Sequence, residues 1–247
     1  MPSSALARSR KPRRGTELVC EWVFRPLAHP LVLLLARLRV PPPVVVVAAG
    51  ATGIAAAVEL GRGSLVAAAL LVQLKTLLDN ADGQLARLTG RTSAFGRYLD
   101  SEVDLLANAA LFTGLGWTTG SPALALAGFL AVTSVLSLNF NVERLSREAS
   151  AEPEAEGRAT AVLRRIYGLV YTPQDRLAEA LVARRPTVTG SVAVSLLANL
   201  GMSTQLAAFG LLMAVGHPRA FAWLALAQVA VIALALLPRR LPQQEVA

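Results

Sequence analysis

The sequence predicts an all-α integral membrane protein, with six transmembrane helices preceded by an N-terminal interfacial amphipathic helix. Its 247 residues are 54% hydrophobic and only 16% charged, and their mean hydropathy is +0.50. A soluble domain is about 45–50% apolar and about a quarter charged. Six apolar stretches approach the roughly 20 helical residues that cross the hydrocarbon core. Arginines gather in alternate connections between these stretches, which is typical of a membrane protein that obeys the positive-inside rule.

The six predicted spans follow one another closely over most of the chain. They lie at 41–60, 64–87, 95–117, 121–140, 197–215 and 220–237. The segment before them, 17–40, alternates apolar runs with arginines and a histidine, which favours a helix lying in the membrane interface. The predicted organisation is therefore a basic tail and interfacial helix over 1–40, a membrane domain over 41–240 and a cytoplasmic tail over 241–247.

The distribution of basic residues predicts the orientation. Of 24 lysines and arginines, 21 lie in the first 40 residues, the 87–97 turn, the 141–186 connection and the C-terminal tail. The positive-inside rule then places all four regions, and both termini, in the cytoplasm. We interpret the connection over 141–186 as a solvated loop followed by a helix on the membrane surface. No apolar stretch with a cleavage site follows the basic N-terminus, so no signal peptide is expected.

Four aspartates flank the turn between the second and third spans. Asp79 and Asp82 are three residues apart and Asp100 and Asp104 are four apart, so each pair shares one helix face. Counting outward from the turn over 88–94, an antiparallel helix pair places Asp82 level with Asp100 and Asp79 level with Asp104. An aspartate at the centre of a spanning helix costs roughly 2.5–3.5 kcal/mol. A cation must therefore offset this cluster, and an all-oxygen cage suits Mg²⁺, Mn²⁺ or Ca²⁺.

The same stretch resembles the signature of the CDP-alcohol phosphotransferases. The fixed residues of the resemblance are Asp79, Asp82, Gly83, Ala86, Arg87, Gly96, Asp100 and Asp104. The resemblance implies an enzyme that transfers a substituted phosphate group from a CDP-linked donor to an alcohol hydroxyl and releases CMP. It also implies a six-helix membrane domain with its active site on the cytoplasmic side.

The resemblance further implies a role for each signature residue. The metal ligands would be Asp79, Asp82, Asp100 and Asp104, with two Mg²⁺ or Mn²⁺ ions as cofactors, and Asp104 would also be the catalytic base. The nucleotide would be bordered by Gly83, Ala86, Arg87 and Gly96. Relatives are commonly homodimers, so a homodimer in the cytoplasmic membrane is expected. No nucleic-acid partner is expected.

The motif does not identify the substrates by itself. Most members of the family use CDP-diacylglycerol and make phospholipids, so this lipid is the expected donor, and inositol phosphate or glycerol phosphate is the expected kind of acceptor. A soluble CDP-polyol donor is an alternative, because the motif matches only cytidine diphosphate and metal. A divalent metal-ion transporter is an alternative of another class. It would need further carboxylates along the spans, and 70–78 and 105–116 contain none.

Several other polar residues are candidates for weaker roles. Lys75 lies one turn deeper than Asp79, where it either forms an ion pair with Asp79 or Asp104 or reaches a substrate phosphate. The candidates for holding the acceptor are Arg97, Arg144, Arg147 and the pair Asp175–Arg176.

Overall fold

All regular elements of the described chain are helices, as predicted. The computed structural model describes residues 15–146 and 157–236, without the side chains of 186 and 187. The elements in order are a π-helical turn (Cys20–Phe24), α2 (Arg25–Arg37), α3 (Pro42–Gly61), α4 (Leu65–Leu88), α5 (Ala94–Thr119), α6 (Pro122–Leu145), α7 (Arg158–Arg184), a 3-10 turn (Pro186–Thr189), α8 (Ser191–Ala198), α9 (Met202–Ala214) and α10 (Pro218–Ala235). Proline begins α3, α6 and α10, where a missing N–H is not needed.

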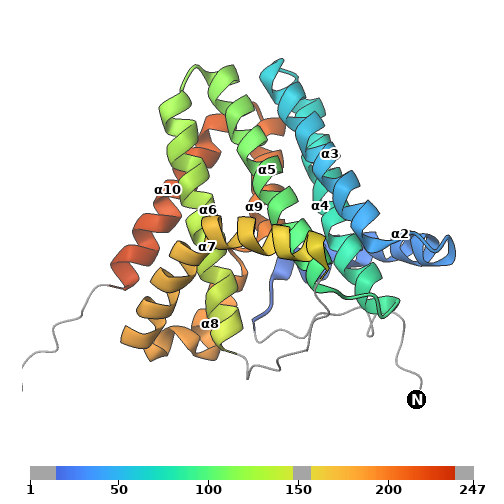
Figure 1. Cartoon of the computed structure of the whole chain (residues 1–247). Helices are drawn as coiled ribbons and strands as arrows, with labels where there is room; N and C mark the ends of the chain where they lie inside the picture. The colour runs from blue at the N-terminus through green and yellow to red at the C-terminus, as the bar shows by residue number, and fades with distance from the viewer. Residues whose placement is uncertain (1–14, 147–156, 237–247) are drawn as a thin grey trace, which may run out of the picture.

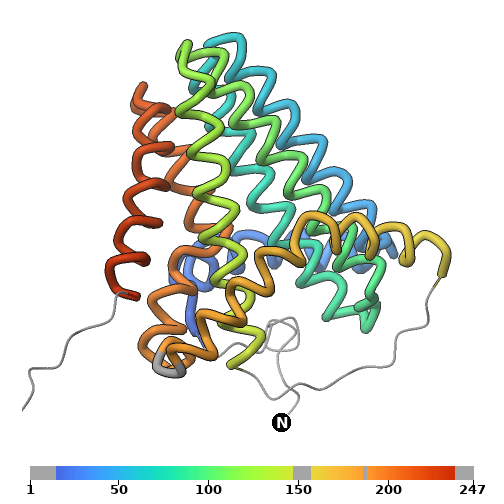
Figure 2. The backbone as a smooth tube through the Cα atoms, turned by 60° about the vertical axis from the view of Figure 1, so that its left-hand side comes forward, coloured from blue at the N-terminus to red at the C-terminus, as the bar shows by residue number. Residues whose placement is uncertain are grey.

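The long helices form a bundle, and two helices lie across one end of it. Figures 1 and 2 show α3, α4, α5, α6, α9 and α10 side by side, with α2 and α7 crossing the lower end. The centre of the bundle is apolar and contains three packed phenylalanines from different helices, Phe112, Phe209 and Phe221. The rings of Phe209 and Phe221 stack with centroids 4.4 Å apart. The membrane-embedded packing of α9 and α10 therefore depends on aromatic contacts.

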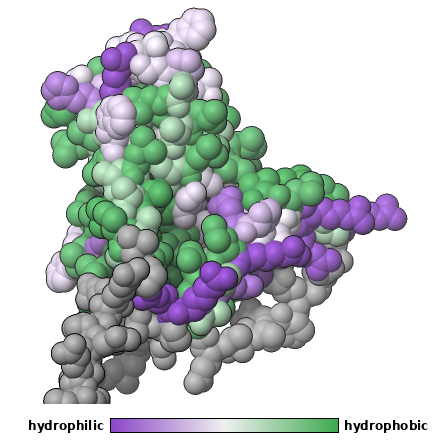
Figure 3. Space-filling model, turned by 90° about the vertical axis from the view of Figure 1, so that its left-hand side faces the viewer, coloured by the Kyte–Doolittle hydropathy of each residue, from purple (hydrophilic) through white to green (hydrophobic). Residues whose placement is uncertain are grey.

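The bundle is that of an integral membrane protein. Four helical segments of the described chain are long and apolar enough to cross a bilayer: Pro42–Gly61, Pro122–Leu145, Ser191–Ala214 and Pro218–Ala235. Figure 3 shows the matching surface, a broad apolar region with polar residues above and below it. Helices α4 and α5 lie within the same bundle but carry the charged residues described below, which lowers their mean hydropathy. The count of six spans therefore stays a prediction.

The fifth predicted span, 197–215, falls on two helices. Helix α8 ends at Ala198 and α9 begins at Met202. Residues far away in the sequence stabilise this break. The side chain of Asn199 accepts a hydrogen bond from the Leu18 N–H and donates to the Thr16 carbonyl, both at 2.9 Å. The Glu17 carboxylate accepts from the Thr204 N–H at 3.2 Å, so it satisfies a free donor at the start of α9.

Two helices lie where surface helices were predicted. Helix α2 packs Ala28 and Val32 inward, while Leu27 and Leu34 stay exposed, and its position in the membrane interface stays a prediction. Helix α7 runs unbroken through Pro173, although a proline inside a helix usually kinks or breaks it. Contacts on both sides of the proline hold the helix against its neighbours. The Tyr171 hydroxyl donates to the Ser101 carbonyl at 3.1 Å, and Asp175 accepts from Asn141 at 2.7 Å.

Candidate active site

The four aspartates converge as the sequence predicted. Asp79 and Asp82 on α4 and Asp100 and Asp104 on α5 all line one cavity of about 320 Å³. The cavity lies at the end of the bundle that α2 and α7 cross, and residues from both of these regions contribute to its wall. Helix pairing around a short turn is therefore enough to collect the four carboxylates, because the turn fixes the level of each one.

Three of the four carboxylates could hold a metal ion. Asp79, Asp82 and Asp100 each offer an oxygen, and these oxygens lie within 4.8 Å of one another. Asp82 is only 6% exposed, and its Oδ2 is buried without a hydrogen-bond partner. An unsatisfied buried carboxylate oxygen is costly and needs an explanation. A hard divalent cation among the three oxygens would provide one, so the residues present fit Mg²⁺ or Mn²⁺.

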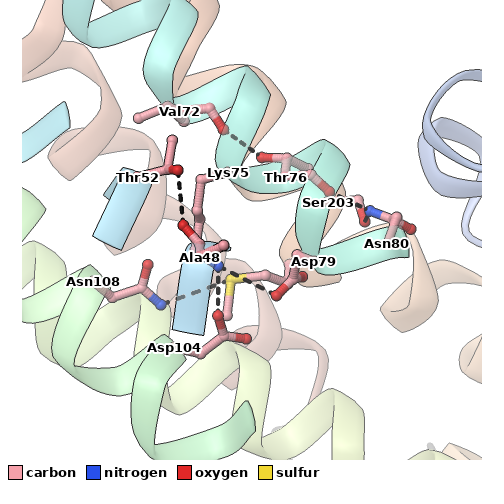
Figure 4. Close-up of polar contacts among 11 residues, drawn as sticks. Ala48, Thr52, Val72, Lys75, Thr76, Asp79, Asn80, Asp104, Asn108 and Ser203 are labelled. Carbon is pink, nitrogen blue, oxygen red and sulfur yellow. Dashed lines mark hydrogen bonds and ion pairs between the residues drawn. The ribbon is translucent and has the colours of Figure 1, made fainter. Parts of the chain in front are cut away.

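The fourth carboxylate is held differently, by a buried lysine. The Lys75 ammonium donates to Asp104 Oδ1 and lies 3.4 Å from Asp79 Oδ1. Figure 4 shows its head group between these two aspartates, on the deep side of the site. Lys75 is fully buried and paired with both carboxylates. The structure therefore favours the ion-pair interpretation of Lys75 over a direct contact with substrate.

The residues expected to border the nucleotide divide into two groups. Gly83 and Arg87 line the cavity beside the aspartates. A Cβ at Gly83 would lie 3.2 Å from both terminal nitrogens of Arg87, so glycine leaves room for the guanidinium. Ala86 and Gly96 do not line the cavity. Instead, the Gly96 N–H donates to the Ser93 hydroxyl at 3.1 Å, which caps the start of α5.

Of the residues expected to bind the acceptor, the structure places only some at the cavity. Asp175 lines the cavity, whereas Arg97, Arg144 and Arg176 do not. The Arg144 guanidinium donates to Glu179 at 2.6 Å and to Asn141 Oδ1 at 2.9 Å. These bonds tie α6 to α7 on the outer side of Asp175. Arg147 lies outside the described residues.

Two tyrosines of the cavity wall were not predicted. Tyr167 and Tyr171 lie one turn apart on α7, and their rings stack with centroids 4.5 Å apart. Tyr98, at the start of α5, packs edge-on against Tyr167 at 5.4 Å. Burial raises the pKa of Tyr167 to about 12 and also raises the pKa of Tyr171, so both remain neutral hydroxyls at physiological pH. The four-residue spacing of Tyr167, Tyr171 and Asp175 was the signal for this shared face.

The N-terminal segment also contributes to the cavity wall. Glu17, Cys20 and Arg25 line the cavity, and the π-helical turn lies between the last two. The Cys20 thiol donates to Asn80 Oδ1 at 3.0 Å. The Asn80 amide in turn donates to Ser203 at 3.1 Å, as Figure 4 shows. The turn therefore attaches the N-terminal segment to α4 next to the aspartates. π-Helical turns of this kind often occur at functional sites.

Comparison with known proteins identifies the family. The family model for CDP-alcohol phosphatidyltransferases matches residues 27–237. The chain belongs to this family of transferases. The match covers the predicted spans, the aspartate signature and α7. The family domain therefore makes up most of this CDP-alcohol phosphatidyltransferase.

Similar curated proteins agree with this assignment. A phosphatidylinositol phosphate synthase of Mycobacteroides abscessus is 28% identical over 162 residues, which is 64% of this chain and 68% of the relative. An archaetidylinositol phosphate synthase of Methanothermobacter thermautotrophicus is 30% identical over 118 residues, 47% of this chain and 60% of the relative. A phosphatidylinositol phosphate synthase of Streptomyces avermitilis is 32% identical over 124 residues, 48% of this chain and 51% of the relative. The matches thus span half to two thirds of these relatives.

Proposed function

We propose that this protein transfers a substituted phosphate group from CDP-diacylglycerol to the hydroxyl of a small alcohol, releasing CMP, in phospholipid biosynthesis. The observation that carries the proposal is the metal-binding triad Asp79, Asp82 and Asp100, with Asp104 on the wall of the same cavity. The chain belongs to a family of CDP-alcohol phosphatidyltransferases, and its relatives include synthases of phosphatidylinositol phosphate. These names support a lipid-linked donor and inositol phosphate, or a comparable small phosphorylated alcohol, as the acceptor.

The proposed reaction forms one oxygen–phosphorus bond and breaks another. The acceptor oxygen bonds to the donor phosphorus nearest the diacylglycerol, and the bond from that phosphorus to the CMP oxygen breaks. Two Mg²⁺ or Mn²⁺ ions held by the aspartates would neutralise the diphosphate and stabilise the leaving CMP. Asp104 accepts the proton of the acceptor hydroxyl. Arg87 contacts the nucleotide phosphates, and Gly83 leaves room for its guanidinium.

The part of the cavity wall that α7 contributes suits a small polyol. Tyr167, Tyr171 and Asp175 line the cavity on the α7 side, and Asn141 donates to Asp175 at 2.7 Å. Neutral tyrosine hydroxyls can donate to or accept from alcohol groups, and a carboxylate accepts from them. We assign acceptor binding to this wall. We also retain Arg147 as a predicted contact of the acceptor.

The same proposal includes the position of the protein in the membrane. Six spans would include α4 and α5, and the end of the bundle crossed by α7 would face the cytoplasm, as the arginine distribution predicts. A lipid-linked donor in the bilayer and a water-soluble acceptor could then meet at the cavity. We also retain three predictions from the sequence as part of this proposal. They are the basic N-terminal tail, the membrane domain over 41–240 and the homodimer.

The orientation is tested with single cysteines in a Cys20→Ser background. Arg62 and Arg91 are both exposed and lie beyond opposite ends of α4. In intact cells, we expect a membrane-impermeant maleimide to label the Arg62→Cys variant and not the Arg91→Cys variant until the membrane is opened. Reversed labelling would contradict the cytoplasmic site. Labelling of both variants from one side would show that α4 does not span the membrane.

The reaction is tested by substrate screening. Purified protein with Mg²⁺ or Mn²⁺ is presented with CDP-diacylglycerol or soluble CDP-alcohols, each together with inositol phosphate, glycerol phosphate or unphosphorylated alcohols. We expect CMP and a phospholipid product, identified by mass spectrometry, only when a lipid donor is present. CMP release from a soluble CDP-polyol alone would replace the lipid donor in this proposal. Lack of CMP from every donor would contradict the proposed reaction.

A further inference from the structure

Lys75 is the one charged residue near the aspartates whose side chain is completely buried, among the residues that the structure describes. Its aliphatic stem passes between α3, α4 and α5. A Cβ at Gly53 of α3 would lie 3.5 Å from Lys75 Cγ and 2.9 Å from the Cβ of Ala107. Glycine at this position therefore lets α3 approach the stem closely. The stem is packed between these helices, and the side chain is fully buried.

The ammonium contacts the two carboxylates that form the deeper level of the site. It donates to Asp104 and lies 3.4 Å from Asp79 (Figure 4). The hydrogen bonds of the ammonium thus go to Asp79 and Asp104. Asp79 is shared, because it also belongs to the metal-binding triad. The site therefore combines a metal position at its outer level with a fixed cation at its inner level.

The formal charges of the aspartates, Lys75 and the bound ions indicate how many divalent ions the site accepts. The four aspartates and the Lys75 ammonium, counted without the other charged residues of the cavity wall, carry a net formal charge of minus three. One divalent ion in the triad reduces the net charge to minus one, whereas a second ion without any other ligand would make it positive. The second ion would also have to displace Lys75 from Asp79 and Asp104, or approach it closely, and two cations in a partly buried site repel strongly. The negative charge of a diphosphate would offset the repulsion between the second ion and the Lys75 ammonium.

We propose that Lys75 competes with a second divalent ion for Asp79 and Asp104, so that the second ion binds only together with a cytidine diphosphate. The first ion binds the triad without nucleotide. Lys75 is thus a positioning residue that orders the loading of the site: first ion, then nucleotide with the second ion. This inference rests on the proposed metal-dependent function, because it needs the triad to bind metal.

The test counts bound Mn²⁺ ions instead of measuring activity. The protein in detergent is titrated with Mn²⁺, and free Mn²⁺ is followed by electron paramagnetic resonance, with and without CDP. For the natural protein we expect one ion per chain without CDP and two with it. The Lys75→Met variant keeps the length of the side chain but removes its charge. We expect this variant to bind two ions without CDP, with the second affinity at least about tenfold higher than in the natural protein.

The possible outcomes separate this inference from the proposed function. Two equivalent ions on the natural protein without CDP would overturn the role of Lys75 and leave the metal site standing. No ion on the natural protein would overturn the metal site itself. The Lys75→Arg variant, which keeps the cation, should bind one ion like the natural protein. The titration of the natural protein with and without CDP decides the question even if neither variant folds.

Discussion

The Asp104→Asn variant is expected to release CMP about 10²–10⁴ times more slowly than the natural protein, because it lacks the general base. Asn has nearly the shape of Asp but does not accept a proton at physiological pH. The triad of Asp79, Asp82 and Asp100 is unchanged, so the variant should still bind one Mn²⁺ ion without nucleotide. The measurement is the initial rate of CMP release at saturating donor and metal, together with the Mn²⁺ titration.

Two controls distinguish lost chemistry from lost structure. Asp104 pairs with the buried Lys75, and removing one partner of a buried pair typically destabilises a protein by about 3–5 kcal/mol. The double variant Lys75→Met with Asp104→Asn removes both partners, so it should fold well and remain inactive. Glu59→Gln makes the same change of acid to amide at the other end of α4, where Glu59 pairs with Arg62 at 2.8 Å, and should leave the rate unchanged. An unchanged rate for Asp104→Asn would contradict the assignment of Asp104 as base.

The sequence was sufficient to predict features that depend on local periodicity. The two aspartate pairs lie on single helix faces, and a short turn sets their levels, so their convergence followed from the spacing of Asp79, Asp82, Asp100 and Asp104. The apolar runs identified the helices of the bundle for a similar reason. The all-helical membrane fold and the family were both confirmed. These features need no knowledge of how distant segments pack.

Features that depend on distant segments could not be predicted. Glu17 contacts the start of α9 across 187 residues of sequence, and no periodicity joins these two positions. Arg144 was expected at the acceptor but is bound by Glu179, because α7 crosses α6 at an angle that sequence spacing does not determine. Asp175 faces the cavity one turn before Glu179 on the same helix. A single helix crossing therefore decides which of these charges reaches the site.

The Asp82→Asn variant is expected to stabilise the metal-free protein while it abolishes metal binding. Asp82 is buried, its Oδ2 has no hydrogen-bond partner, and two other carboxylates lie nearby. Asn removes the charge and can donate to a neighbouring carboxylate, so we expect the free energy of unfolding to rise by about 1–3 kcal/mol. The natural protein should gain about 2.7 kcal/mol from metal at a hundred times its dissociation constant, and the variant should gain nothing. Thermal unfolding in detergent, with and without Mg²⁺, measures both effects.

Glu102→Gln provides the matched control. Glu102 is also a buried acid on the adjoining helix α5 with an unpartnered Oε1, but it does not line the cavity. Its replacement should stabilise the protein for the same reason and should leave the stabilisation by Mg²⁺ intact. If Asp82→Asn lowers the metal-free midpoint, or keeps the full stabilisation by Mg²⁺, then the triad is not the metal site. If both variants lose the stabilisation, the loss is not specific to the triad, and the assignment of the metal to Asp82 is overturned. Only the expected pair of results links the unpartnered oxygen of Asp82 to a bound cation.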